Sequence, residues 1–158
     1  MLRVIAHVPA ADVTAAPYDT ITLAADERRL RRKVLRLMGG DEIFIDFPSA
    51  VTLGHKDALQ LEDGRLAGIL AADEPLYEIR GRDRTHLIRL AWHLGNRHLP
   101  AQLEETRILI RRDHVIADML KGLGATIVEI EAPFSPEHGA YHDHSHGSAQ
   151  GHALLYRK

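Results

Sequence analysis

Cysteine is absent from all 158 residues of this sequence. Disulfide bonds and thiolate metal ligands are therefore excluded for this chain, and any metal site must use nitrogen and oxygen donors. The hydrophobic content of 45% is normal for a globular protein with a buried core. Aromatic residues are scarce, at 5%, so aliphatic side chains must fill most of that core. The length suits one ordinary domain or two small ones.

Long apolar runs and a large charge of one sign are missing as well. No stretch approaches the roughly 20 apolar residues of a membrane span. The apolar stretch at the N-terminus is too short for a signal peptide, and Pro9 and Asp12 interrupt it. The formal net charge of −2 lacks the basic excess that is typical of nucleic-acid-binding proteins. We therefore expect a cytoplasmic protein that binds neither nucleic acid nor a membrane.

Recognisable catalytic motifs are also lacking. The chain has no His-Glu-x-x-His helix, Gly-x-Ser-x-Gly elbow, P-loop or Rossmann glycine fingerprint, and its few serines lie in no catalytic setting. The sequence therefore indicates a protein that is not an enzyme. A zinc-dependent hydrolase is the third-ranked hypothesis, because it would need a fixed ligand set with an open position and a nearby carboxylate base.

Residues 1–72 have the pattern of a small all-β domain. Short apolar segments alternate with turn signals, of which Asp63-Gly64 is the strongest hairpin signal. We predict strands over residues 2–8, 20–23 and 43–47, the last ended by Pro48. The basic run at residues 28–33 is more typical of a solvated strand or loop than of a site; its functional interpretation is an acidic protein partner or an anion.

Residues 73–135 follow a different pattern after the polar joint Asp73-Glu74-Pro75. Asp83 and Asp113 are predicted to cap two helices with apolar residues at helical spacing, the first from Arg84 to about Leu94 before Gly95-Asn96. Strands are predicted over residues 76–80, 102–104, 107–110 and 126–130. The resulting order βαββαβ is that of a ferredoxin-like domain. The chain is thus predicted to be α+β, with a mobile histidine-containing tail over residues 136–158.

Histidines gather in that tail. His142, His144 and His146 alternate, with His138 before them and His152 after them. A short histidine-rich tract is typical of metal binding, and imidazole suits Zn, Cu, Ni and Fe. The competing interpretation is a solvated tail or a purification tag, which the interleaved acidic and glycine residues disfavour.

Two further histidines are candidate ligands. His98 follows the first predicted helix and is weak evidence alone, but a two-fold dimer would bring two copies of it together, and tail histidines could complete the coordination. His114 follows the Asp113 cap and is equally consistent with a secondary ligand and with a neighbour of the cap. His93 is interpreted as a helix-surface residue, and His7, His55 and His86 as ordinary surface or partly buried residues.

Three blocks of the sequence resemble one known family. His93-Leu94-Gly95-Asn96-Arg97-His98-Leu99-Pro100 resembles an HLGNRH-x-P block, and Asp113-His114-Val115 with Asp118-Met119-Leu120 resembles a D-H-V-x-x-D-M-L helix. Pro133-Phe134, Pro136-Glu137 and Gly139-Ala140-Tyr141 resemble a P-F-x-P-E-x-G-A-Y stretch. These blocks are similar to those of the urease accessory protein UreE, a family of nickel metallochaperones.

The resemblance implies a function and a set of ligands. It implies an N-terminal domain for protein contacts and a C-terminal domain that binds metal and forms a homodimer. It also implies Ni²⁺ delivery for urease maturation, with Zn²⁺ or Cu²⁺ as competing ions. The implied partners are other urease accessory proteins, including the nucleotide-dependent nickel-insertion protein, and the urease apoprotein complex. The implied ligands are His98, His114, His142, His144, His146 and His152.

One departure and one alternative accompany this resemblance. Some family members carry a histidine where this chain has Arg112, which weakens the case for an auxiliary site at His114. The alternative function is a metal-regulated protein-interaction module, in which the β domain is a chaperone-like platform and the metal controls dimerisation without being delivered.

Overall fold

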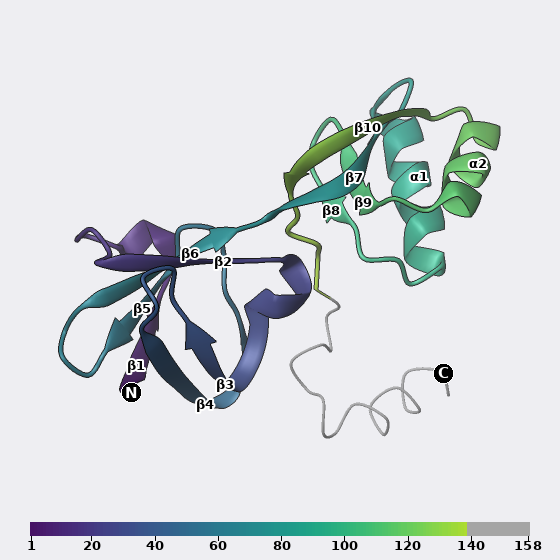
Figure 1. The fold of residues 1–158 in the computed structure, drawn as a ribbon. Coiled ribbons are helices and arrows are strands. Elements are labelled where there is room, and N and C mark those ends of the chain that lie inside the picture. The colour runs from purple at the N-terminus through teal and green to yellow at the C-terminus, as the bar shows by residue number, and fades with distance from the viewer. Residues whose placement is uncertain (139–158) are drawn as a thin grey trace, which may run out of the picture.

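The computed structural model describes residues 1–138 and arranges them as two lobes (Figure 1). The first lobe consists of strands and two short 3-10 turns, η1 (Ala10–Asp12) and η2 (Ala25–Arg28). The second lobe combines four strands with two helices. This arrangement confirms the predicted α+β class. The predictions made for the tail from residue 139 onward lie outside the described residues.

One mixed sheet builds the first lobe. Its strands are β1 (Leu2–Val8), β2 (Asp19–Leu23), β3 (Arg29–Arg36), β4 (Glu42–Thr52), β5 (Ala58–Leu61) and β6 (Leu66–Ala71). They lie in the order β2-β6-β5-β1-β4-β3, with β1–β4 and β2–β6 as parallel pairs. Buried residues of all six strands, such as Leu23, Leu35 and Ile69, share one core. The sheet therefore surrounds an aliphatic core, as the scarcity of aromatic residues requires.

One turn and one predicted strand end of this sheet test the predictions. Asp63-Gly64 joins β5 to β6 as expected, and Gly64 adopts a φ of +90°, which costs glycine little. The prediction that Pro48 ends its strand was wrong, because β4 continues to Thr52. The pairing of β3 with β4 shifts register between Leu30 and Arg32. Pro48 falls within this irregular stretch, where the missing proline N–H breaks no ladder hydrogen bond.

The second lobe has the predicted order βαββαβ. Its elements are β7 (Asp73–Arg80), α1 (Arg84–Asn96), β8 (Gln102–Leu103), β9 (Ile108–Arg111), α2 (His114–Gly122) and β10 (Thr126–Pro133). The strands lie in the order β10-β7-β9-β8, and all neighbours are antiparallel. Both helices pack on the same face of the sheet (Figure 1), where Ile79, Leu90 and Leu120 belong to one buried cluster. The ferredoxin-like arrangement is confirmed.

The helix starts were predicted correctly, and one helix end was not. The Asp83 carboxylate accepts a hydrogen bond from the His86 N–H at 2.8 Å, and Asp113 accepts from the N–H groups of Val115 and Ile116. Helix α1 continues through Gly95 and Asn96, because the left-handed residue that ends it is His98, with a φ of +56°. Glycine at position 95 was therefore a misleading stop signal.

His86 is a structural residue of this lobe. It is 6% exposed, its Nδ1 accepts a hydrogen bond from the Arg82 N–H at 2.9 Å, and its Nε2 lies 2.7 Å from the Leu123 carbonyl oxygen. Since a backbone N–H only donates and a carbonyl only accepts, the ring must carry its proton on Nε2. The imidazole thereby ties the start of α1 to the end of α2, so it is more than the ordinary histidine predicted.

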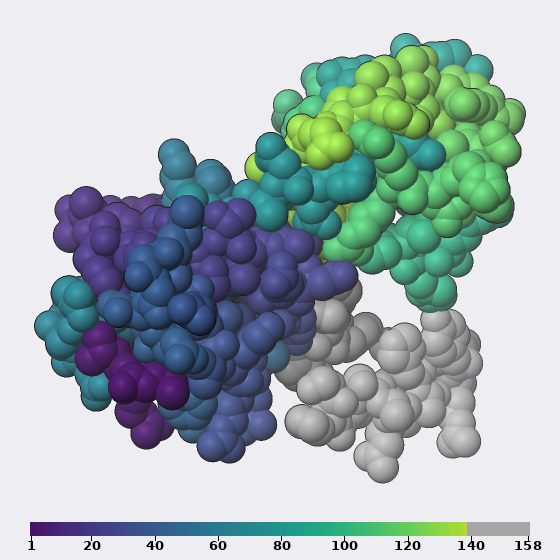
Figure 2. All heavy atoms as spheres, viewed as in Figure 1, coloured from purple at the N-terminus to yellow at the C-terminus, as the bar shows by residue number. Residues whose placement is uncertain are grey.

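Contacts between the lobes centre on Arg28. This residue is 3% exposed, and its guanidinium donates through Nη1 to the Leu53 carbonyl at 3.1 Å and through Nη2 to the Phe134 carbonyl. Glu74 accepts from the Ala25 N–H at 3.0 Å across the same joint. Figure 2 shows the two lobes meeting at this narrow region. The prediction that the basic run is solvated was therefore wrong for Arg28, which is buried where the lobes join.

Candidate metal centre

His98 stands at the exposed end of α1. Its backbone N–H donates to the Gly95 carbonyl at 3.0 Å, and its left-handed conformation turns the chain away from the helix. Histidine is among the side chains that adopt this conformation more often than most. The side chain is exposed and makes no hydrogen bond to another residue in the described part of the chain. Its imidazole therefore neither caps the helix nor packs in the hydrophobic core.

An apolar stripe runs along α1 toward this end. Ile88 and Trp92 are 68% and 65% exposed, and Leu103 on β8 beside them is 46% exposed. The first two lie four residues apart and so share one helix face. A hollow of about 290 Å³, lined by Ile88, Ala91 and Leu103 among others, separates the helix from β8. Exposed apolar patches of this kind mark interaction sites.

Sequence reasoning missed this stripe because it looked for one apolar face on each helix. In α1, Leu87, Leu90 and Leu94 satisfy that expectation and are buried. The signal that was available is a second i, i+4 pair of large apolar residues, Ile88 and Trp92, beside the core face.

The chain returns to the neighbourhood of His98 after β10. The Glu137 N–H donates to the Ala101 carbonyl at 2.8 Å, and the Ser135 N–H donates to Gln102 Oε1 at 2.8 Å. Residues 134–138, which we call the tail root, therefore run beside residues 100–102. That segment begins two residues after His98. The histidine-rich part of the sequence begins only four residues after the tail root.

A cavity of about 640 Å³ lies between the lobes at the tail root. Pro100, Pro136 and His138 line it from the second lobe, and Arg28 and Asp57 line it from the first. Both lobes therefore shape the place where the tail begins.

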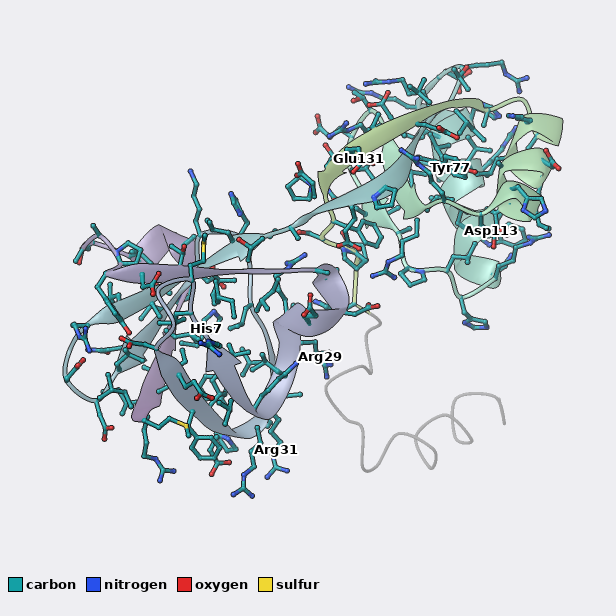
Figure 3. All side chains as sticks on the ribbon, in the orientation of Figure 1. His7, Arg29, Arg31, Tyr77, Asp113 and Glu131 are labelled. Carbon is teal, nitrogen blue, oxygen red and sulfur yellow. The ribbon has the colours of Figure 1, made fainter. Side chains whose placement is uncertain are left out.

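His114 is the first residue of α2, and its side chain is exposed. The adjacent Asp113 carboxylate is engaged by the backbone N–H groups that it caps, at the helix start labelled in Figure 3. Arg112 donates to the carbonyls of Leu76 and Ile130 at 3.2 and 3.0 Å, so it braces β7 and β10. His114 Nδ1 and Nε2 make no hydrogen bond within the described residues, so its imidazole remains available to an ion.

No closed metal site forms within residues 1–138. Among them, no three histidine, aspartate or glutamate side chains gather as a set that could hold an ion. His98 and His114 are therefore each an isolated, exposed imidazole of the described chain. The remaining candidates, His142, His144, His146 and His152, lie outside the described residues. The described helices include none with the length and apolar character needed to cross a membrane.

Comparisons with known proteins identify the class to which these two lobes belong. The family model for the N-terminal domain of the UreE urease accessory protein matches residues 2–72, and the model for its C-terminal domain matches residues 74–154. The two matches together extend over nearly the whole sequence. The chain thus has the domain composition of a urease accessory protein.

Individual relatives agree with this class. The urease accessory protein UreE of Rhizobium leguminosarum bv. trifolii is 54% identical over 154 residues, covering 97% of this chain and 80% of that protein. The UreE of Agrobacterium fabrum is 54% identical over 144 residues, covering 91% and 89%. The UreE 1 of Brucella suis biovar 1 is 55% identical over 142 residues, covering 89% and 88%.

This chain belongs to the UreE family of urease accessory proteins. The resemblance inferred from the three sequence blocks is thereby confirmed. Membership in a family of accessory proteins also confirms that the chain is not an enzyme itself.

Proposed function

We propose that this protein is a nickel metallochaperone that carries Ni²⁺ as cargo and delivers it during maturation of the urease active site. The observation that carries this proposal is the hydrogen bond from Glu137 to Ala101, which holds the tail root beside the segment that follows the exposed His98. We assign protein contacts to residues 1–72, metal binding and dimerisation to residues 73–135, and ligand supply to residues 136–158.

A homodimer supplies the second half of the site in this proposal. Burying the apolar stripe against a second copy would remove Ile88, Trp92 and Leu103 from water, at about 25 cal/mol per Å² of apolar surface. A two-fold contact places the same surface on both sides. Because the stripe leads to the end of α1, two copies of His98 would then lie near the axis and share one Ni²⁺.

Tail histidines complete the coordination. His142 is four residues from His138, and an extended chain of four residues reaches at most about 14 Å. His142, His144, His146 and His152 therefore supply imidazoles from a segment whose root is anchored beside the shared site. An ion held partly by such a segment is released more readily than one in a closed cage, which suits delivery.

His114 is proposed as a secondary ligand that holds an ion in transit. Its exposure at the start of α2 supports this role, whereas the bracing role of Arg112 leaves no second donor two residues earlier. Nitrogen donors accept Zn²⁺ and bind Cu²⁺ more strongly than Ni²⁺, so supply and geometry must select nickel. Protons compete with metal for imidazole, so acidification weakens binding.

The proposed partners follow from the family. We propose that the homodimer acts in the cytoplasm and passes nickel to the other urease accessory proteins, in particular the nucleotide-dependent nickel-insertion protein bound to the urease apoprotein complex. The relatives are themselves named urease accessory proteins, which supports a role in urease maturation.

Urease activation at limiting nickel tests the proposal. His98→Ala should lower activation several-fold relative to wild type, and excess nickel should restore it. His93→Ala is the matched control, since His93 lies in the last turn of α1 and is not a proposed ligand. Activation by the His98→Ala variant at the wild-type level under limiting nickel would overturn the proposal.

A truncation separates delivery from the alternative of a metal-regulated interaction module. Removing residues 139–158 takes away the tail ligands and leaves the tail root in place. A delivery protein should lose most of its effect at limiting nickel, whereas an interaction module should keep it. A variant with alanine at positions 142, 144, 146 and 152 controls for the shortened chain.

A further inference from the structure

The outer face of the first sheet carries two arginines against one aromatic ring. The guanidinium carbons of Arg3 on β1 and Arg32 on β3 lie 5.4 and 5.7 Å from the centroid of the Phe44 ring on β4. Phe44 pairs with Arg3 across one side and with Val34 across the other. Cation–π attraction holds both guanidinium groups beside the ring. Their side chains nevertheless remain 61% and 70% exposed.

Aliphatic residues interleave with these cations. Ile5 is 60% exposed two positions after Arg3, and Val34 is 41% exposed two positions after Arg32. We call Arg3, Ile5, Arg32, Val34 and Phe44 the cationic face. Three further cations of β3 are exposed as well, and Figure 3 shows the first of them projecting away from the strand: Arg31, Lys33 and Arg36.

The carboxylates on this surface do not saturate the guanidinium groups. Asp46 lies 3.9 Å from Arg3 Nη2 and 4.0 Å from Arg32 Nε, so one carboxylate is shared loosely between two cations. Exposed pairs at such distances contribute little. Each guanidinium has five N–H donors in a fork that matches a carboxylate. Donors therefore remain available to carboxylates of another molecule.

We propose that the cationic face is a docking surface for an acidic segment of another polypeptide, with aliphatic residues between its carboxylates. The charge on the face is complementary to such a segment, and Ile5 and Val34 match its aliphatic side chains. β3 ends the strand order of this sheet in the described part of the chain, so an extended segment has a strand edge to follow.

Other occupants fit the same surface less well. A second copy of this chain would place cations against cations, which is repulsive. A phosphate backbone offers no aliphatic groups for Ile5 and Val34, whose exposed side chains would stay in water. The proposal does not depend on the nickel site, which lies in the other lobe.

Binding of a designed probe tests the proposal. A short fluorescein-labelled peptide of alternating glutamate and valine is titrated with the full-length, nickel-free protein and followed by anisotropy. We expect saturable binding that weakens with salt, because the Debye length shortens. Arg32→Glu should weaken it at least about tenfold. Lys56→Glu, which reverses one exposed charge outside the cationic face, should leave it unchanged. A lysine-for-glutamate peptide should not bind.

Several results would overturn the proposal. One is an Arg32→Glu variant that binds the peptide as tightly as wild type does. Another is an equal loss of peptide affinity in Arg32→Glu and Lys56→Glu. Tighter binding of a single-stranded oligonucleotide or of phosphatidylserine vesicles would also reject it and reassign the face to phosphate. If Arg32→Glu has a lower melting temperature than wild type, Arg32→Gln replaces it in the titration. A smaller loss of peptide affinity is then expected. Nickel titration of the same variants should match wild type, so failure here is distinguishable from failure of the proposed function.

Discussion

Asp57 joins three segments of the first lobe through one carboxylate. It accepts hydrogen bonds from the Gly54 N–H at 2.7 Å, from the Ala10 N–H at 2.8 Å and from His7 Nε2 at 2.6 Å. Burial raises the pKa of Asp57, but the hydrogen bonds from Gly54, His7 and Ala10 favour the carboxylate more strongly. The net pKa of Asp57 therefore lies below its ordinary value.

This lowered pKa predicts loss of stability in acid. A group whose pKa is depressed in the folded state stabilises the fold above its unfolded pKa of about 3.9, and this contribution disappears as the pH falls through the folded value. Unfolding by urea at about pH 7 and about pH 3 measures the effect. Asp57→Asn should be less stable at neutral pH and less sensitive to acid. Asp12→Asn, at an exposed neighbouring position, should behave like wild type. Equal acid sensitivity in all three proteins would contradict this account.

At the residue scale, local rules were predictable and distant partners were not. The caps Asp83 and Asp113 depend on N–H groups two or three residues away, so the sequence predicted them. His86 and Arg28 owe their roles to Leu123 and Phe134, which lie 37 and 106 residues away. No local sequence pattern indicates a hydrogen-bond partner so far away in the chain. His98 was found as a candidate ligand, but its left-handed conformation was not foreseen.

At the scale of elements, strand existence was predictable and strand length was not. β7 and β10 each extend three residues beyond the predicted segment, because Asp73 pairs with Pro133 and the ladder continues to Arg80 and Thr126. Each strand supplies the hydrogen-bond partners of the other, so neither end is fixed by its own residues. The order of elements was predictable because helical and alternating patterns differ over many residues.

The exposed face of α1 predicts the assembly of the protein. Ile88→Asp places a charge in the apolar stripe, which would be desolvated in a dimer. If the stripe forms the proposed homodimer, light scattering should find wild type dimeric and the variant monomeric at the same concentration. Val128→Asp, at a 49% exposed position of β10, is the control and should remain dimeric. A dimeric Ile88→Asp variant would mean that another surface forms the dimer.

At the scale of the whole molecule, one buried arginine connects the first lobe to the tail root. Burial lowers the pKa of Arg28, and the carboxylates of Glu74 and Asp57 oppose this effect. Its Nε has no hydrogen-bond partner within the described residues, while its two terminal nitrogens bind the carbonyls of Leu53 and Phe134. The first lobe therefore helps to set where the tail begins.

Removing this connection should cost stability. Arg28→Met leaves two buried carbonyl groups without donors, which predicts a loss of about 2 to 4 kcal/mol. Arg31→Met changes an exposed position of β3, so its free energy of unfolding should lie within about 0.5 kcal/mol of the wild-type value. Urea unfolding followed by circular dichroism compares the two variants. A stability loss in Arg31→Met equal to that in Arg28→Met would show that the buried contacts are not its cause.

In the proposed nickel site, two copies of His98 share one ion. Calorimetric titration with Ni²⁺, with the mass determined by light scattering on the same samples, tests it in wild type, His98→Ala and His93→Ala. We expect one tight ion per dimer in wild type and in His93→Ala, and loss of that ion in His98→Ala without loss of the dimer. Tight binding of one ion per dimer in His98→Ala would contradict the account and move the site to other histidines.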